Sequence, residues 1–154
     1  MFRPELRPSR RQFLSVASAA GAFLASPDAS HAADLPAIEA RNIQVVTDFC
    51  NTIAARDMTT LASLVTDTVV YRLKEDARPI TGRDAVLARI RTFFDGADVV
   101  ELRILKSQAI GPVVINERID IFEGPKKHWR FHLTGMFFVK DGKIQEWTDY
   151  VIPE

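Results

Sequence analysis

The 154-residue chain contains a single cysteine and no excess of either charge. Cys50 has no partner for an intramolecular disulfide, and one thiol cannot build a cysteine metal site, so we expect a small buried apolar residue there. The 20 basic and 20 acidic residues balance, which argues against nucleic acid as a partner, because phosphate binding requires clustered Lys and Arg. No histidine pair or acid cluster has metal-ligand spacing, and we therefore expect no metal and no other cofactor.

Long apolar runs are also scarce, and none has the length of a stable membrane anchor. A mildly apolar run at residues 13–26 follows the paired arginines of "SRRQFL" and precedes the small residues of "SHAA". These features resemble a twin-arginine export signal cleaved after Ala32. We expect residues 1–32 to be this signal peptide, recognised by the twin-arginine export machinery, and residues 33–154 to form one periplasmic domain. The alternative is that the run forms an N-terminal anchor helix.

The part of the chain that follows begins with helical patterns. Apolar residues at helical spacing predict a first helix over residues 38–55. Asp57 or Thr59 is suited to cap a short second helix, and Thr81 or Gly82 to start a third. Between the second and third helices, "VVYRL" at residues 69–73 predicts a strand.

The second half of the chain has strand patterns instead. Residues 99–110, 113–122, 128–139 and 144–152 predict four successive strands. Asp141-Gly142 lies between the last two and is a strong hairpin signal. Helices followed by strands predict an α+β domain, in which the helices pack on one side of a curved antiparallel sheet.

The predicted strand "VVINERIDIF", residues 113–122, has two different faces. One face, apolar enough to face a core, carries Val113, Ile115, Glu117, Ile119 and Ile121. The opposite face carries Val114, Asn116, Arg118, Asp120 and Phe122. The polar row on this second face is typical of a solvent-exposed surface, or of the polar floor of a pocket.

Two later strands place large apolar residues beside a further acid. Asp149 lies between Trp147 and Val151 on one face of "EWTDYVI". One face of "HWRFHLTGMFFV" consists of Trp129, Phe131, Leu133, Gly135 and Phe137. These faces are suited to wall an apolar cavity whose few polar groups are Arg118, Asp120 and Asp149.

Two carboxylates and a guanidinium in an apolar cavity need one another, because a buried charge without a partner is costly. Arg118 can bridge Asp120 and Asp149 through its fork of donors. Burial and like-charge repulsion can then leave one acid protonated and the other ionised. Such a pair can donate a proton to a leaving oxygen while it removes one from water. A structural ion pair or a solvated edge-strand face explains the same pattern, so both interpretations stay open.

Four stretches of the chain resemble the limonene-1,2-epoxide hydrolase family, within the nuclear transport factor 2-like (SnoaL-like) superfamily. They are "GRDAV", "NERIDIF", "GMFFVKDGKI" and "WTDY", which start at residues 82, 116, 135 and 147. The resemblance implies a cone-shaped α+β fold with a deep pocket, often dimeric, in which N-terminal helices pack on a curved mixed, mostly antiparallel sheet. It also implies one-step addition of water to an epoxide, without a metal or a covalent intermediate.

The resemblance also assigns roles to particular residues. Asp120 corresponds to the acid that protonates the epoxide oxygen, Arg118 to the bridging arginine and Asp149 to the base that activates water. The family holds this water with a Tyr-x-Asn motif on an early strand. Here Tyr71 corresponds to the tyrosine, but Leu73 stands at the asparagine position. The chain also stops at Glu154, whereas the family usually continues into a segment that helps to close the pocket, and a more open pocket is therefore expected.

The predicted site has two parts. Catalytic roles are predicted for Asp120, Arg118, Asp149 and Tyr71. Substrate contacts are predicted for Asn116, Phe122, Trp129, Phe131, Leu133, Phe137 and Trp147. His132 is expected at the surface or in a dimer interface, and His128 in a solvated turn.

Three functions compete. The leading hypothesis is an exported, homodimeric epoxide hydrolase that acts on a small, mostly apolar epoxide, and the intact set of Arg118, Asp120 and Asp149 favours it. The missing asparagine at position 73 favours a non-catalytic periplasmic binder of an apolar small molecule. The third is a polyketide-cyclase or ketosteroid-isomerase type of enzyme that uses one acid for enolisation.

Overall fold

The computed structural model describes residues 28–153, with side chains from residue 35 onward. Three helices, α1 (Asp28–Ala54), α2 (Met58–Ser63) and α3 (Arg83–Phe94), are interspersed with two strands, β1 (Val65–Arg72) and β2 (Ile80–Thr81). Four long strands follow: β3 (Val99–Ile110), β4 (Val113–Gly124), β5 (Lys127–Lys140) and β6 (Lys143–Val151). Most of the predicted signal peptide, residues 1–27, lies outside the described residues. None of the helices described is both long enough and apolar enough to cross a membrane.

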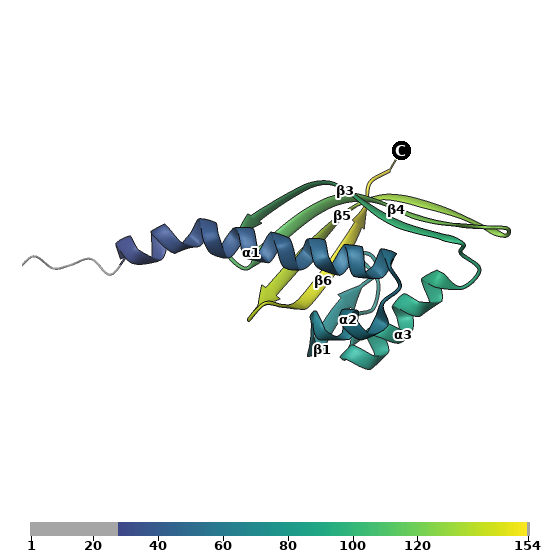
Figure 1. Ribbon diagram of the computed structural model, residues 1–154, viewed down its shortest axis with the longest axis horizontal. Helices are drawn as coiled ribbons and strands as arrows, with labels where there is room; N and C mark the ends of the chain where they lie inside the picture. The colour runs from purple at the N-terminus through teal and green to yellow at the C-terminus, as the bar shows by residue number, and fades with distance from the viewer. Residues whose placement is uncertain (1–27, 154) are drawn as a thin grey trace, which may run out of the picture.

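The strands form one six-stranded sheet in the order β2-β1-β6-β5-β4-β3. All neighbouring strands are antiparallel except β1 and β6, which are parallel. The sheet is curled but not closed, and α1 runs across its concave side while α2 and α3 lie near β1 (Figure 1). The expected α+β fold, with helices on one side of a mixed and mostly antiparallel sheet, is therefore confirmed.

Local sequence signals determine several element boundaries. Asp57 caps α2, because its carboxylate accepts the backbone N–H groups of Thr59 and Thr60 at 3.1 and 3.0 Å. Gly82, with φ +96°, precedes α3. The predicted Asp141-Gly142 hairpin is confirmed, and both residues have the positive φ values of a two-residue type I′ turn, 51° and 74°.

Two elements are longer than predicted. Helix α1 begins at Asp28 rather than near residue 38, because its first turns are rich in alanine, which favours a helix without giving an apolar period. Strand β1 begins at Val65 rather than Val69, and its extra residues include the polar Thr66, Asp67 and Thr68. Pairing of Val65 with Ile144 in β6 extends the strand, and a long-range contact of this kind has no local sequence signal.

The core lies between α1 and the concave face of the sheet. Val46, Phe49, Cys50 and Ile53 recur along α1 at helical spacing and are buried. Burial of Cys50 as a small apolar residue is as predicted. These helical residues pack with inward-facing residues of the strands, including the buried Val114, Phe137 and Trp147.

The expectation that the more apolar face of β4 suits a core is wrong. The face of Val113, Ile115, Glu117, Ile119 and Ile121 was predicted to suit a core, but it is the outer face: Ile115 is 43% exposed, and of the five only Ile121 is buried. The buried face is the one with Asn116, Arg118 and Asp120. All three helices cover the same side of the sheet, so the polar row lies beneath them while the more apolar row faces outward.

Candidate active site

Three charged side chains meet on the concave face of the sheet. Arg118 and Asp120 are two residues apart on β4, and Asp149 lies two strands away on β6. The intervening β5 pairs its Gly135 with both Asn116 of β4 and Asp149 of β6. The strand register therefore places all three charges on one face, with Arg118 required to reach across β5.

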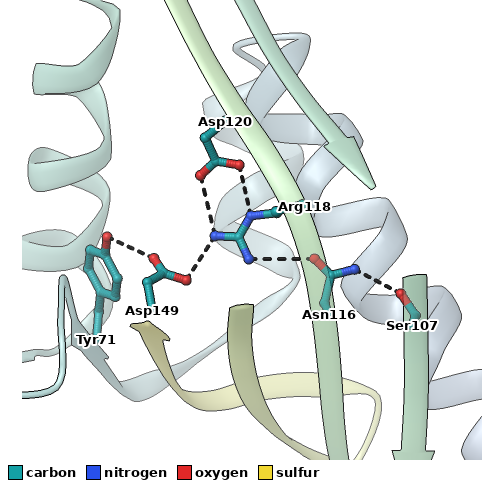
Figure 2. Close-up of polar contacts among 6 residues, drawn as sticks. All are labelled: Tyr71, Ser107, Asn116, Arg118, Asp120 and Asp149. Atoms are coloured by element: carbon teal, nitrogen blue, oxygen red, sulfur yellow. Dashed lines mark hydrogen bonds and ion pairs between the residues drawn. The ribbon is translucent and has the colours of Figure 1, made fainter. Parts of the chain in front are cut away.

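Arg118 bridges the two acids, as predicted (Figure 2). Its Nε donates to Asp120 Oδ1 at 2.9 Å, and its Nη2 donates to Asp149 Oδ1 at 2.8 Å and to Asp120 Oδ2 at 3.4 Å. The three residues are only 3%, 8% and 5% exposed for Arg118, Asp120 and Asp149. We refer to these three residues as the triad.

Gly135 gives Arg118 the space to cross β5. A Cβ atom at this position would collide with Arg118 Nη1 and with the ring of Phe137. Gly135 lies on the face that strand alternation predicts, but no role for it was predicted. The available signal was a glycine in the middle of an otherwise bulky strand face, which is typical of a close approach by another group.

Tyr71 adds a fourth polar group. Its hydroxyl donates to Asp149 Oδ2 at 3.2 Å, so Asp149 accepts hydrogen bonds on both oxygens (Figure 2). The Tyr71 ring stacks on Trp147, with centroids 4.3 Å apart and an interplanar angle of 21°. Leu73, two residues further along the chain, also lines the cavity and offers no hydrogen-bonding group there.

The triad lies in the wall of a cavity of about 330 Å³. Five of the predicted substrate-contacting residues line it: Phe122, Trp129, Phe131, Leu133 and Trp147. Trp129 and Phe131 are partly exposed, whereas Trp147 is buried, so the aromatic wall runs from the mouth to the interior. A volume of this size suits a small organic ligand.

Asn116 and Phe137 were predicted to contact substrate, but neither is among the residues that line this cavity. Both contact Arg118, and Phe137 also packs against Phe49 and Trp147. Asn116 donates to Ser107 Oγ at 2.8 Å and accepts from Arg118 Nη1 at 3.5 Å, and the Arg118 guanidinium carbon is 5.7 Å from the Phe137 ring centroid. The face assignment by strand alternation was right, but a residue on that face is covered where Arg118 lies over it.

The helices contribute lining residues that were not predicted from the sequence. Phe49 and Ile53 come from α1, and Arg89, Ile90 and Phe93 come from α3. The remaining lining residues are Lys74, after β1, with Leu102 and Val151 on strands. Helical spacing identified apolar faces, but it could not show which ones would reach the same cavity as the triad.

The environment shifts the pKa of three of the polar groups that line the cavity. Burial raises the pKa of Asp120 to about 6, even though Arg118 lowers it, and the charge of Asp149 adds to the rise. Burial opposes the charge of Arg118, but Asp149 and Asp120 outweigh it and hold the pKa of Arg118 above its ordinary range. Burial, followed by the charge of Asp149, also raises the pKa of Tyr71, so its hydroxyl stays a donor.

The two histidines whose side chains are described, His128 and His132, are not among the residues that line the cavity. His132 lies on the outer face of β5, where its Nε2 is 2.9 Å from Glu117 Oε1. His128 is exposed, as predicted, but lies in β5 rather than in a turn. His31 precedes the residues whose side chains are described. Within the described chain, no group of three His, Cys, Asp or Glu side chains is placed to hold a metal ion.

Comparison with known proteins points to one family. The model of the limonene-1,2-epoxide hydrolase catalytic domain matches residues 40–152. An LEH-like epoxide hydrolase from M. tuberculosis is 27% identical, with a TM-score of 0.66 over 74% of this chain and 84% of that one. No match is found among curated proteins.

More distant structures share the fold alone. A protein with a ketosteroid isomerase-like fold from Catenulispora acidiphila DSM 44928, in complex with trimethylamine, is 17% identical, with a TM-score of 0.60 over 69% of this chain and 83% of that one. Bal32a, from a soil-derived mobile gene cassette, is also 17% identical, with a TM-score of 0.65 over 73% and 90% of the two chains.

Proposed function

The chain belongs to the limonene-1,2-epoxide hydrolase family, and on this basis we propose that it is an epoxide hydrolase that adds water to a small, mostly apolar epoxide. The observation that carries the proposal is the bridge from Arg118 to both Asp120 and Asp149 in the wall of an apolar cavity. One guanidinium holds both acids, Asp120 through Nε and Nη2 and Asp149 through Nη2, so the two carboxyl groups can act on two atoms of one substrate. The raised pKa of Asp120 supports its role as the proton donor.

The proposed reaction is a single displacement. Asp149 removes a proton from water, and the water oxygen bonds to one epoxide carbon. The bond from that carbon to the epoxide oxygen breaks, and Asp120 gives its proton to this oxygen to form the diol. The reaction leaves Asp149 protonated and Asp120 ionised, so one proton must return from Asp149 to Asp120 before the next turnover. Tyr71, hydrogen-bonded to Asp149, positions this carboxylate.

The test is a panel of apolar epoxides in isotopically labelled water, with enzyme in excess over substrate. One-step addition places the solvent oxygen in the diol of the first turnover. A covalent ester on an aspartate would instead give first-turnover diol with unlabelled oxygen from the protein. Unlabelled diol would exclude the proposed mechanism, and absence of any diol across the panel would count against the proposed function.

Asparagine variants test the two roles. Asp149→Asn cannot accept a proton from water, and Asp120→Asn cannot donate one to the epoxide, so each should lower turnover by roughly 10²–10⁴-fold. The losses should not add, because both groups act in one step. Asp48→Asn, on the exposed side of α1, is the matched control and should retain full turnover.

One observation favours a non-catalytic binder instead. Leu73 lines the cavity near Tyr71 without a polar group to help hold a water. If the wild type opens no epoxide, binds apolar ligands tightly, and keeps that affinity in both asparagine variants, the protein is a binder and not a hydrolase.

We also propose export to the periplasm through the twin-arginine pathway, on the basis of "SRRQFL", and assembly as a homodimer through the outer face of the sheet. Ile115 pairs with Met136 on that face, and Phe138 and Tyr150 lie nearby on β5 and β6. All four are more than a third exposed in the single chain, and an apolar patch of this kind is typical of an interface.

A further inference from the structure

The charges that line the cavity are unevenly distributed. Among the described lining residues, the only acids are Asp120 and Asp149, and both are paired with Arg118. The two other charged lining residues, Lys74 and Arg89, are both basic. The triad balances its own charges when Asp120 is protonated, so the remaining charged groups of the lining, Lys74 and Arg89, are both positive.

Arg89 is the more available of these two cations. Lys74 Nζ lies 3.0 Å from Asp76 in an exposed pair, which locally neutralises it. Arg89 forms no ion pair within the described part of the chain; it donates one hydrogen bond, from Nη1 to Thr92 Oγ1 at 3.2 Å. Its guanidinium carbon lies 4.9 Å from the ring centroid of Phe93, which also lines the cavity. Four of its five N–H groups therefore remain available to a ligand.

An apolar path connects Arg89 with the triad. Phe122 follows Asp120 on the same face of β4, and its ring centroid is 5.4 Å from that of Phe93. Arg89 lies over Phe93, so the route from Asp120 through the two rings to its guanidinium is about 17 Å long and the straight separation is shorter, counting about 7 Å for two residues along a strand. This length suits an alkyl chain between two polar ends.

From this arrangement we infer that the cavity selects an amphipathic ligand, an alkyl chain with its epoxide at the triad and a carboxylate at Arg89. The epoxide end of this inference rests on the proposed function, whereas recognition of the carboxylate does not require turnover. Guanidinium groups bind carboxylates through paired hydrogen bonds. Arg89 is partly exposed, so the carboxylate stays partly hydrated and the full cost of burying a charge is avoided.

Binding of a stable analogue tests the carboxylate end by itself. Undecanoate and its neutral primary amide have the same chain, and quenching of Trp129 and Trp147, which both line the cavity, reports their affinity. The wild type should bind undecanoate about fivefold more tightly than the amide, as expected for a partly exposed charge pair. Arg89→Gln should remove the difference and leave amide binding unchanged. Arg91→Gln, an exposed residue of the same helix outside the cavity lining, is the matched control and should retain it.

Turnover tests the complete ligand. The two substrates are the terminal epoxide of undecylenic acid and the primary amide of the same epoxide. Arg89→Gln should raise KM about fivefold for the acid alone and leave kcat unchanged, because the carboxylate contact is equally strong in the ground state and the transition state. If neither epoxide is opened, the proposed function fails while the binding measurement still decides the role of Arg89. Equal binding of undecanoate and amide by the wild type, or equal losses for both in Arg89→Gln, would overturn the inference while leaving epoxide hydrolysis intact.

Discussion

Gly135 leaves open the space through which Arg118 reaches across β5. The two residues lie on different strands, and a Cβ at position 135 would overlap Arg118 Nη1. The bridge between Asp120 and Asp149 therefore depends on the charges and also on glycine at position 135, because any other residue would add a Cβ atom there.

Gly135→Ala should disrupt this bridge while the sheet remains folded. The added methyl group displaces the guanidinium, so kcat should fall at least about tenfold, and overpacking should lower the free energy of unfolding by about 1–3 kcal/mol. Kinetics and denaturant unfolding measure the two effects. Thr134→Ala, the preceding residue on the outer face of β5, is the control. Full turnover in Gly135→Ala would show that Arg118 can act from another position.

The pH dependence of catalysis should follow Asp120. Its carboxyl must be protonated to donate, and its pKa is raised to about 6. The value of kcat/KM should therefore decline as the pH rises through about 6, approaching tenfold for each further pH unit. A pH profile of kcat/KM measures this decline. A profile that stays flat from below pH 6 into the alkaline range would contradict the assignment of Asp120 as the acid.

Asp120 should also make the free energy of unfolding depend on pH. An ordinary ion-paired carboxylate stabilises the fold more as pH rises, whereas Asp120 should stabilise it less. Its pKa is raised from 3.8 to about 6 on folding, so the native state binds more protons than the unfolded state between these values. The contribution of Asp120 to the free energy of unfolding therefore falls as pH rises through this window. Asp120→Asn should remove this part of the pH dependence in denaturant unfolding, and an unchanged slope would argue against a raised pKa.

Leu73→Asn restores the asparagine of the family's Tyr-x-Asn motif. The new amide would lie near Tyr71 and could help to orient the attacking water, so kcat should rise about fivefold, the equivalent of one hydrogen bond of about 1 kcal/mol. Leu73→Ala controls for the loss of the larger side chain and should give no such gain. A fall in kcat for Leu73→Asn would indicate that the substrate needs an apolar contact at this position.

The homodimer proposal is tested on the outer face of the sheet. Met136→Glu places a charge beside Ile115 in the apolar patch and should convert a dimer into a monomer, as measured by light scattering during gel filtration. Leu35→Glu, at an exposed position of α1 away from this sheet face, should remain dimeric. A wild type that is monomeric at high concentration would refute the proposal directly.

Export is tested at the paired arginines. Changing Arg10 and Arg11 to Lys keeps the charge but removes the guanidinium groups, and precursor should then accumulate in the cytoplasm. Cell fractionation measures the distribution. Undiminished export of the double variant would exclude the twin-arginine pathway.

Strand alternation was sufficient to predict that Arg118 and Asp120 share one face of their strand, but not that this face is the buried one. Arg118, Asp120 and Asp149 occupy alternate positions within strongly patterned strands, so the face of each residue was fixed by its own strand. Strand alternation could not show which residues of a face line the cavity. Asn116 and Phe137 are on the same face but do not line the cavity, because neighbouring side chains, Arg118 among them, pack over them. The contribution of Arg89 was also not predictable, since it depends on how α3 rotates and docks against the sheet.

Cys50 provides a built-in reporter for the integrity of the site. It is the only thiol in the chain, is fully buried in α1 and lies close enough to the triad for all three charges to affect its pKa, which burial raises to about 12. A thiol reagent can therefore reach it only when α1 separates from the sheet. The rate of labelling gives the free energy of that local opening, and a ligand that holds the cavity closed will slow the labelling in proportion to its occupancy, without any catalytic readout.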